Sequence, residues 1–202
     1  MKRAWYPALL LLTWIAGGAQ AEIMVVGFDE TTAPPGELGG YGMRSFPADL
    51  RPVIQDVTFV PGPTGDVLFD RPLSHRRVGV GWLIWGHGYD GDLYFTNGAL
   101  EVELTLPTDT GAFIVYASSN CWSDITVTAN DGTSLTQYTY FSDGAVGWGF
   151  WTTGDPKITS LSFSAYGCDF AIGEFLIAEV PEPSGLTLFA VGGLGLLCRR
   201  RR

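Results

Sequence analysis

The chain has 202 residues, of which 46% are hydrophobic and 16% charged, and its formal net charge is −9. This acidic balance excludes nucleic acid as a partner, because contact with phosphates needs a basic surface. The basic residues are also unevenly placed, since six of the twelve lie within the first three and the last four positions.

Residues 1–21 have the pattern of a secretory signal peptide. A cationic start is followed by a mainly apolar stretch at 8–16 and by an A-x-A cleavage site formed by Ala19 and Ala21. We therefore expect export by the Sec route, with cleavage after Ala21.

Residues 22–180 form the predicted mature domain. It keeps six basic and twenty acidic residues, which gives a formal charge of −14. A chain of this length can bury one sizeable hydrophobic core. Its charge repels nucleic acid and favours neutral sugars or divalent cations as partners.

Residues 31–52 are less regular than the rest of this domain. They carry four prolines and four glycines and lack the alternation of a strand. The segment is too short for a separate domain. We expect it to pack as an ordered loop over one sheet, or to remain mobile.

The remainder of the mature domain has the pattern of β-structure. In residues 99–106 apolar and polar side chains alternate, as in a strand with one buried face. Turn signals separate such runs, and Asn97-Gly98 is the sharpest signal for a β-hairpin. The pattern predicts an all-β fold, an antiparallel β-sandwich or jelly roll. The other strand-like runs are 56–60, 65–69, 92–96, 112–117, 123–128, 135–141, 157–164 and 170–178.

Cys121 and Cys168 are the two cysteines of the mature domain, and each follows a predicted strand. An exported protein meets an oxidising environment, in which an even number of cysteines favours pairing. We predict a disulfide between them. The alternative is two free thiols.

The mature domain offers few groups for catalysis. Its only histidines are His75 and His87, and neither lies in a recognisable nucleophile motif. A glycosidase pair would have to come from carboxylates such as Asp90, Asp92 or Glu101, whose separation the sequence does not set. We therefore predict a protein that is not an enzyme.

Aromatic and polar side chains instead indicate a glycan-binding site. An exposed aromatic face stacks on a sugar ring, and polar side chains fix the orientation of a ligand. A place in the hydrophobic core is the alternative for each tryptophan. The candidates are His87, Tyr89, Asp90, Asp92, Trp148 and Trp151.

No cofactor is predicted, but the sequence leaves a structural calcium ion as an alternative. Asp90, Asp92 and Asp131 lie in turn-like sequence and offer the oxygen ligands that calcium prefers. None of them belongs to a full EF-hand loop. A structural calcium ion and ordinary turn formation are the two explanations.

The C-terminal segment, 181–202, has three features in fixed order. A helix over its apolar stretch, 184–198, would be about 22 Å long, which is short for a hydrocarbon layer of about 30 Å. Arginines flank membrane spans on the cytoplasmic side, so the mature domain would lie outside. The alternative is a core segment beside a solvated charge run. The defining residues are Pro181, Glu182 and Pro183 before the stretch, and Arg199, Arg200, Arg201 and Arg202 after it.

This order resembles the PEP-CTERM sorting signal of Gram-negative bacteria. The resemblance implies transient anchoring of a hydrophobic C-terminal helix in the inner membrane and recognition by an exosortase that cleaves near Pro-Glu-Pro. It also implies a final place at the cell surface or in the extracellular matrix, in an exopolysaccharide or biofilm setting. In residues 86–98, 104–107 and 170–175 the mature domain resembles uncharacterised secreted bacterial proteins and β-sandwich proteins of galactose-binding-like or carbohydrate-module type.

These features predict a non-catalytic surface or matrix protein that is sorted by an exosortase and binds exopolysaccharide. Two alternatives are open. One is a purely structural or adhesive matrix component, and the other is a glycan-active hydrolase.

Overall fold

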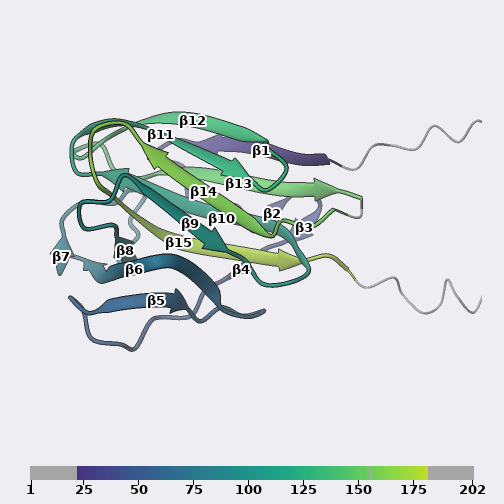
Figure 1. Ribbon diagram of the computed structural model, residues 1–202, viewed down its shortest axis with the longest axis horizontal. Coiled ribbons are helices and arrows are strands. Elements are labelled where there is room, and N and C mark those ends of the chain that lie inside the picture. Colours follow the sequence, from purple (N-terminus) through teal and green to yellow (C-terminus); the bar gives the residue numbers. More distant parts are fainter. Residues whose placement is uncertain (1–21, 155, 182–202) are drawn as a thin grey trace, which may run out of the picture.

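The computed structural model describes residues 22–154 and 156–181 of the chain (Figure 1). The predicted signal peptide and all of the sorting segment except Pro181 lie outside the described residues. Among the described residues, no helix is long and apolar enough to span a membrane.

All regular structure in the described part of the chain is β-structure. The strands are β1 (Glu22–Phe28), β2 (Glu37–Leu38), β3 (Tyr41–Gly42), β4 (Arg44–Ser45), β5 (Asp56–Val60), β6 (Val67–Val78), β7 (Gly81–Trp82), β8 (Asp92–Phe95), β9 (Glu101–Thr105), β10 (Thr110–Ser119), β11 (Trp122–Ala129), β12 (Ser134–Tyr140), β13 (Val146–Thr153), β14 (Ser160–Ala165) and β15 (Phe170–Glu179). The all-β fold is thus confirmed.

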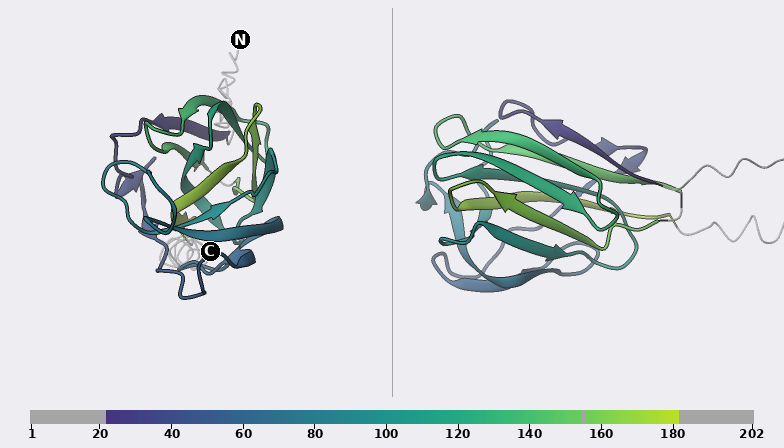
Figure 2. Two further views of the ribbon diagram at one scale, coloured as in Figure 1. Left: turned by 90° about the vertical axis from the view of Figure 1, so that its left-hand side faces the viewer. Right: turned by 45° about the horizontal axis from the view of Figure 1, so that its top comes forward.

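Thirteen of the strands form one hydrogen-bonded sheet, and β2 and β3 pair separately. The main path runs β1-β13-β10-β15-β8-β6-β9-β14-β11-β12, and neighbours along it are antiparallel. The sheet curls so that its two halves face each other across the interior (Figure 2). A side-chain hydrogen bond joins the second strand of this path to the last: Trp148 Nε1 in β13 donates to the Leu135 carbonyl oxygen in β12 at 2.9 Å.

Strand β6 connects the two halves of the curled sheet. Its residues 68–69 pair with β9, whereas its residues 74–76 pair with β8. Pro72 lies between these two stretches, where its lack of an N–H costs no ladder bond. As a result β8 and β9 pair with separate stretches of the same edge of β6, and β5 pairs with the other edge.

This arrangement corrects the prediction of a hairpin at Asn97-Gly98. The turn itself forms, with φ of 52° at Asn97 and 93° at Gly98. However, it leads from β8 to β9, which do not pair with each other. Local sequence predicts the turn, but the pairing of both flanking strands with separate stretches of β6 depends on long-range contacts.

Strand β13 was also absent from the expected strands, because its sequence alternates glycine with large aromatic residues. The glycines allow side chains to lie over the backbone: a Cβ at Gly147 would be 2.5 Å from the Tyr116 ring. Phe150 and Trp148 fill the interior from the same strand. The strand is buried on both faces along most of its length, so it shows no polar alternation.

The sheet buries side chains on both faces of its β13-β10-β15-β8 half. In β10, Phe113 and Val115 point into the interior, whereas Ile114 and Tyr116 belong to a second apolar cluster on the outer face. The irregular segment 31–52 covers that outer face, with Leu38 among the buried residues of the cluster. The segment contains the short strands β2, β3 and β4.

The chain enters the sheet at Glu22 and leaves it after Glu179 at the same end of the molecule (Figure 1). The loops between β10 and β11, β12 and β13, and β14 and β15 lie at the opposite end (Figure 2). Any surface formed by these loops lies at the end of the domain opposite to Glu22 and Glu179 (Figure 1).

Candidate functional site

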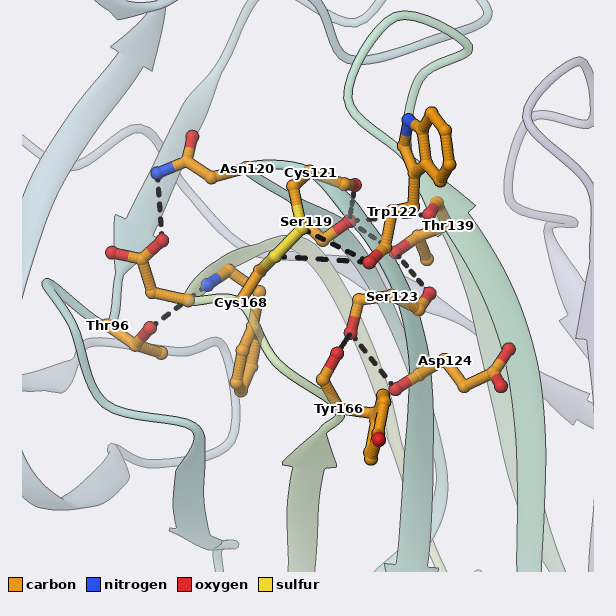
Figure 3. Close-up of a disulfide and its surroundings, with 12 residues drawn as sticks. Thr96, Ser119, Asn120, Cys121, Trp122, Ser123, Asp124, Thr139, Tyr166 and Cys168 are labelled. Carbon is orange, nitrogen blue, oxygen red and sulfur yellow. Dashed lines mark hydrogen bonds between the residues drawn. A yellow bond between two sulfur atoms is a disulfide. The ribbon is translucent and has the colours of Figure 1, made fainter.

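The predicted disulfide between Cys121 and Cys168 is present (Figure 3). It joins the β10–β11 loop to the β14–β15 loop across 47 residues of sequence. Asp169 strengthens the junction, because its carboxylate accepts hydrogen bonds from Asn120 Nδ2 at 3.0 Å and from the Gly98 amide at 2.9 Å. The loops at the end distant from the termini are thus held in one arrangement.

These loops expose large apolar side chains. Trp122 is 68% exposed and Tyr166 is 84% exposed, and in Figure 3 both rings point away from the disulfide. Trp122 packs edge-on against Tyr140, which in turn contacts Phe141. A hollow of about 380 Å³ lies beside Phe141 and is also lined by Asn120, Trp82 and Ile84. We call the group Leu83, Ile84, Trp122, Phe141 and Tyr166 the aromatic end surface.

A buried ionic network lies near the start of β8. Asp92 Oδ1 accepts hydrogen bonds from Arg77 Nε at 2.9 Å and Nη2 at 2.7 Å, while Oδ2 accepts from the Asp49 amide at 2.7 Å. His75 is fully buried, with Nε2 3.0 Å from Asp92 Oδ1 and Nδ1 3.1 Å from the Pro52 carbonyl oxygen. Both ring nitrogens of His75 therefore lie within hydrogen-bond distance of an acceptor oxygen.

Asp49 extends this network. Its carboxylate accepts hydrogen bonds from Arg51 Nε, at 2.9 Å, and from the Tyr94 hydroxyl, at 3.0 Å. Burial alone would raise the pKa of Asp49, but the hydrogen bonds from Arg51 and Tyr94 and the charge of Arg51 outweigh burial and lower the pKa to about 2. The carboxylates of Asp49 and Asp92 are therefore hydrogen-bonded to two guanidinium groups, those of Arg51 and Arg77, and to the imidazole of His75.

His87 and Glu174 form a second buried histidine–carboxylate pair, which lies outside this ionic network. Glu174 is only 9% exposed, and both of its carboxylate oxygens lie 2.8 Å from His87 Nε2. Trp85 Nε1 donates to Glu174 Oε2 at 2.9 Å. His87 Nδ1 is buried and has no hydrogen-bond partner among the described residues. Burial raises the pKa of Glu174 above its ordinary value, although the hydrogen bonds from His87 and Trp85 oppose this.

Both members of this pair occupy unusual backbone conformations. The pairing of β10 with β15 shifts between Tyr116↔Gly173 and Ile114↔Leu176, so the extra residues form a β-bulge at Glu174. Glu174 has φ of 52° and His87 has φ of 33°, both in the left-handed region. Without the bulge, simple alternation would place Glu174 on the same face as Ile172, which lies in the interior core. The bulge directs Glu174 to the outer face instead.

One cavity of about 300 Å³ is lined by members of both groups. Asp92 and Tyr94 come from the ionic network, Glu174 and Phe175 from the bulge of β15, Tyr89 from the preceding loop, and Phe46 from the covering segment. No lysine, arginine or histidine is among the residues that line it. Tyr89 is held there by its hydroxyl, which donates to the Asp92 carbonyl oxygen at 2.9 Å.

The structure brings together some of the predicted glycan-binding residues and separates others. Tyr89 and Asp92 line the cavity, and His87 reaches it through Glu174. Trp148 must be removed from the set, because it is fully buried in the interior core and has no face available to a sugar. Trp151 packs on the outer face against the covering segment and does not line the cavity.

The three aspartates considered for calcium have different surroundings. Asp92 belongs to the ionic network, and Asp131 accepts hydrogen bonds from the Thr133 amide, at 2.8 Å, within the β11–β12 turn. Asp90 is exposed next to the cavity-lining Tyr89. Within residues 22–154 and 156–181, no group of three or more His, Cys, Asp or Glu side chains is placed to hold a metal ion.

The sequence analysis missed Glu174 and the aromatic end surface. Glu174 lies in a long apolar run, where an isolated acid within a buried strand is an available signal for a special role. Trp122 and Tyr166 each lie within two residues of a cysteine that predicts a fixed loop. That spacing was the signal that could have pointed to them.

Comparison with known proteins identifies the C-terminal segment. Residues 179–202 match the model of the PEP-CTERM protein-sorting motif. The chain carries a PEP-CTERM sorting signal. The motif marks an exported protein with a C-terminal sorting region that is processed by an exosortase, and it follows directly on the last strand of the sheet.

The mature domain itself has no significant match among curated proteins. Three solved structures of mutants of a family 29 carbohydrate-binding module align with it at 11% identity and a TM-score of 0.27. The alignments cover 82%, 79% and 80% of this chain and 99%, 93% and 99% of those chains. At this TM-score the similarity carries no argument about a ligand.

Proposed function

We propose that the protein is a non-catalytic component of the cell surface or extracellular matrix of a Gram-negative bacterium, and that it binds exopolysaccharide through the aromatic end surface. The observation that carries this proposal is the exposure of Trp122 and Tyr166 beside the disulfide, together with the exposed Phe141 in the β12–β13 loop. Exposed aromatic faces on a rigid support stack on sugar rings with little loss of conformational entropy.

The position of this surface fits the sorting signal. The chain leaves the sheet at the end opposite to the aromatic loops (Figure 1). While the C-terminal segment holds the protein at a membrane, the aromatic end surface therefore points away from that membrane. A polysaccharide outside the cell would meet Trp122 and Tyr166 first.

Polar groups for sugar hydroxyls are available next to the aromatic rings. Asn120 lines the hollow beside Phe141, and its amide is oriented by Asp169. The formal charge of −14 on the mature domain favours a neutral or cationic polysaccharide over an anionic one. The proposed ligand is thus a neutral or amine-bearing exopolysaccharide.

A catalytic role is not proposed, because the cavity presents only one carboxylate with spare hydrogen-bonding capacity. Glycoside hydrolysis commonly uses two carboxyl groups, one of them as a proton donor. Asp92 already accepts hydrogen bonds from Arg77, His75 and the Asp49 amide. Glu174 would therefore stand without a free second carboxylate.

The test is binding of the purified full-length protein to a panel of immobilised polysaccharides, in a detergent without a sugar headgroup. We expect Trp122→Ala and Tyr166→Ala each to weaken binding by about fivefold or more, the free energy of one aromatic contact. Tyr138→Ala is the matched control, since Tyr138 is an exposed tyrosine on β12 outside this surface. Absence of binding to every polysaccharide, or equal binding by Trp122→Ala and the wild type, would contradict the proposal.

A structural or adhesive role is the second candidate, and the exposed Leu83 favours it, because apolar side chains on a rigid end also suit contact with a second copy. Sedimentation of the wild type and of Leu83→Ser, with and without calcium, separates the two roles. Self-association that is lost in Leu83→Ser, together with no binding to sugars, would favour adhesion.

A further inference from the structure

Glu174 is a buried carboxylate whose charge the protein does not balance. Its one basic contact is His87, whose side chain is 6% exposed. If His87 were an imidazolium, its buried Nδ1 would carry an N–H without an acceptor, which is costly for a charged donor. The neutral form that donates from Nε2 fits the contacts, so an ionised Glu174 keeps its full negative charge.

The backbone that positions the Glu174 carboxylate is conformationally strained. Glu174 and His87 both have positive φ values, which are unfavourable for residues other than glycine. Gly86, next to His87, lies so close to the chain after β1 that a Cβ there would be 2.6 Å from the Glu30 carbonyl oxygen. Two strained residues therefore hold a carboxylate whose burial by itself lowers stability.

Glu174 also has hydrogen-bonding capacity left. An ionised carboxylate has about four acceptor positions. His87 approaches both oxygens and Trp85 donates to Oε2, which leaves one position on Oε1. Glu174 lines the 300 Å³ cavity, whose walls include the aromatic rings of Tyr89 and Phe46 but no basic side chain.

We propose that this cavity binds a primary ammonium group, with Glu174 as its counter-ion. An ammonium group has three N–H donors, supplies the missing positive charge and is attracted to aromatic faces. The cavity volume is at the lower end of the range for small-molecule sites, which suits one sugar ring or a smaller amine. The two sources of this chemistry are an amino sugar and a free aliphatic amine. The inference is independent of the aromatic end surface.

Calorimetric titration of the full-length protein with four probes tests the proposal. Glucosamine carries the charge and the ring, N-acetylglucosamine and glucose carry the ring without the charge, and ethanolamine carries the charge without the ring. We expect glucosamine or ethanolamine to bind at least about tenfold more tightly than glucose and N-acetylglucosamine, because a buried carboxylate strongly prefers a cation. Tighter binding of glucosamine than of ethanolamine identifies an amino-sugar site, and the reverse order identifies an amine site.

Two variants connect that preference to the cavity. Glu174→Gln keeps the shape and removes the charge, so we expect it to abolish the preference for the charged probes. Ala48→Trp fills the cavity from the covering segment and leaves Glu174 unchanged, so it tests the site even if Glu174→Gln does not fold. Glu101→Gln, on the outer face of β9, and Trp122→Ala are the controls that keep the preference. The proposal is overturned if the charged probes bind no better than glucose, or if both cavity variants bind them as the wild type does.

Discussion

The two buried histidine–carboxylate pairs of this domain differ in how fully they are matched. His75 and Asp92 belong to a network in which two arginines and a backbone amide satisfy the carboxylates. His87 and Glu174 have only each other and one indole N–H. The first pair ties the segment before β5 to β6 and β8. In the second pair, Glu174 lines a cavity and its negative charge is not balanced. This property is expected of a ligand-binding site.

The largest difference between the two regions should appear when their carboxylates are removed. Asp92→Ala leaves Arg77 and His75 without their acceptor, and we expect it to lower the free energy of unfolding by about 3–5 kcal/mol. Asp90→Ala, two residues away and exposed, should change it by less than about 0.5 kcal/mol. Urea denaturation followed by tryptophan fluorescence measures both. A loss at Asp92 no larger than at Asp90 would show that the network does not stabilise the fold.

Separate substitutions of His75 and His87 should lower the free energy of unfolding by intermediate amounts. Glutamine offers one donor group, so His75→Gln loses the hydrogen bond either to Asp92 or to the Pro52 carbonyl oxygen, at a cost of about 2–3 kcal/mol. His87→Gln can still donate to Glu174 and should cost about 1 kcal/mol. The same denaturation experiment decides the order. Equal losses would contradict the distinction between the matched and unmatched pairs.

The pH dependence of stability should give the smallest effect. Its sign should be opposite for Asp49 and for Glu174. The pKa of Asp49 is lowered to about 2 in the folded state, so its contribution is present above the ordinary value of 3.8 and is lost as pH falls toward 2. We therefore expect the destabilisation caused by Asp49→Asn to shrink over that interval. Thermal melts of the variant and the wild type between pH 2 and about 6 measure it. A destabilisation that stays constant with pH would contradict this role.

Glu174 should show the opposite trend. Its pKa is raised in the folded state, so its favourable contribution is present below the ordinary value of 4.5 and is lost as pH rises through the folded pKa. Glu174→Gln lacks this loss, and its stability relative to the wild type should increase as pH rises from about 4 to 7. The same melts provide the comparison. If the stability of Glu174→Gln relative to the wild type fell as pH rises, the negative charge of Glu174 would be balanced by its surroundings, contrary to this prediction.

Local patterns in the sequence were sufficient for much of the fold. The predicted run 56–60 coincides with β5, and 123–128 lies within β11, because a strand with one buried face alternates visibly. The same rule fails for β13, which is covered on both faces, and for the partners of the Asn97-Gly98 turn. Strand order depends on contacts between residues far apart in sequence, which no local pattern encodes.

The candidate site was less predictable than the fold. Tyr89 and Asp92 line the same cavity because they are only three residues apart in the chain. Trp148 was misplaced because an aromatic side chain gains free energy equally from a core and from a ligand, and only the surrounding strands decide between them.

By itself the sequence determined the C-terminal sorting signal of this protein, its acidity, its β-structure and its disulfide, because sorting motifs, charge and cysteine pairing follow from residue types and short spacings. The tertiary structure alone decided the candidate sites. His87 and Glu174 are 87 residues apart and meet only because a β-bulge turns Glu174 to the outer face of the sheet. A bulge arises from the register of two distant strands, and that register is fixed by packing rather than by the local sequence.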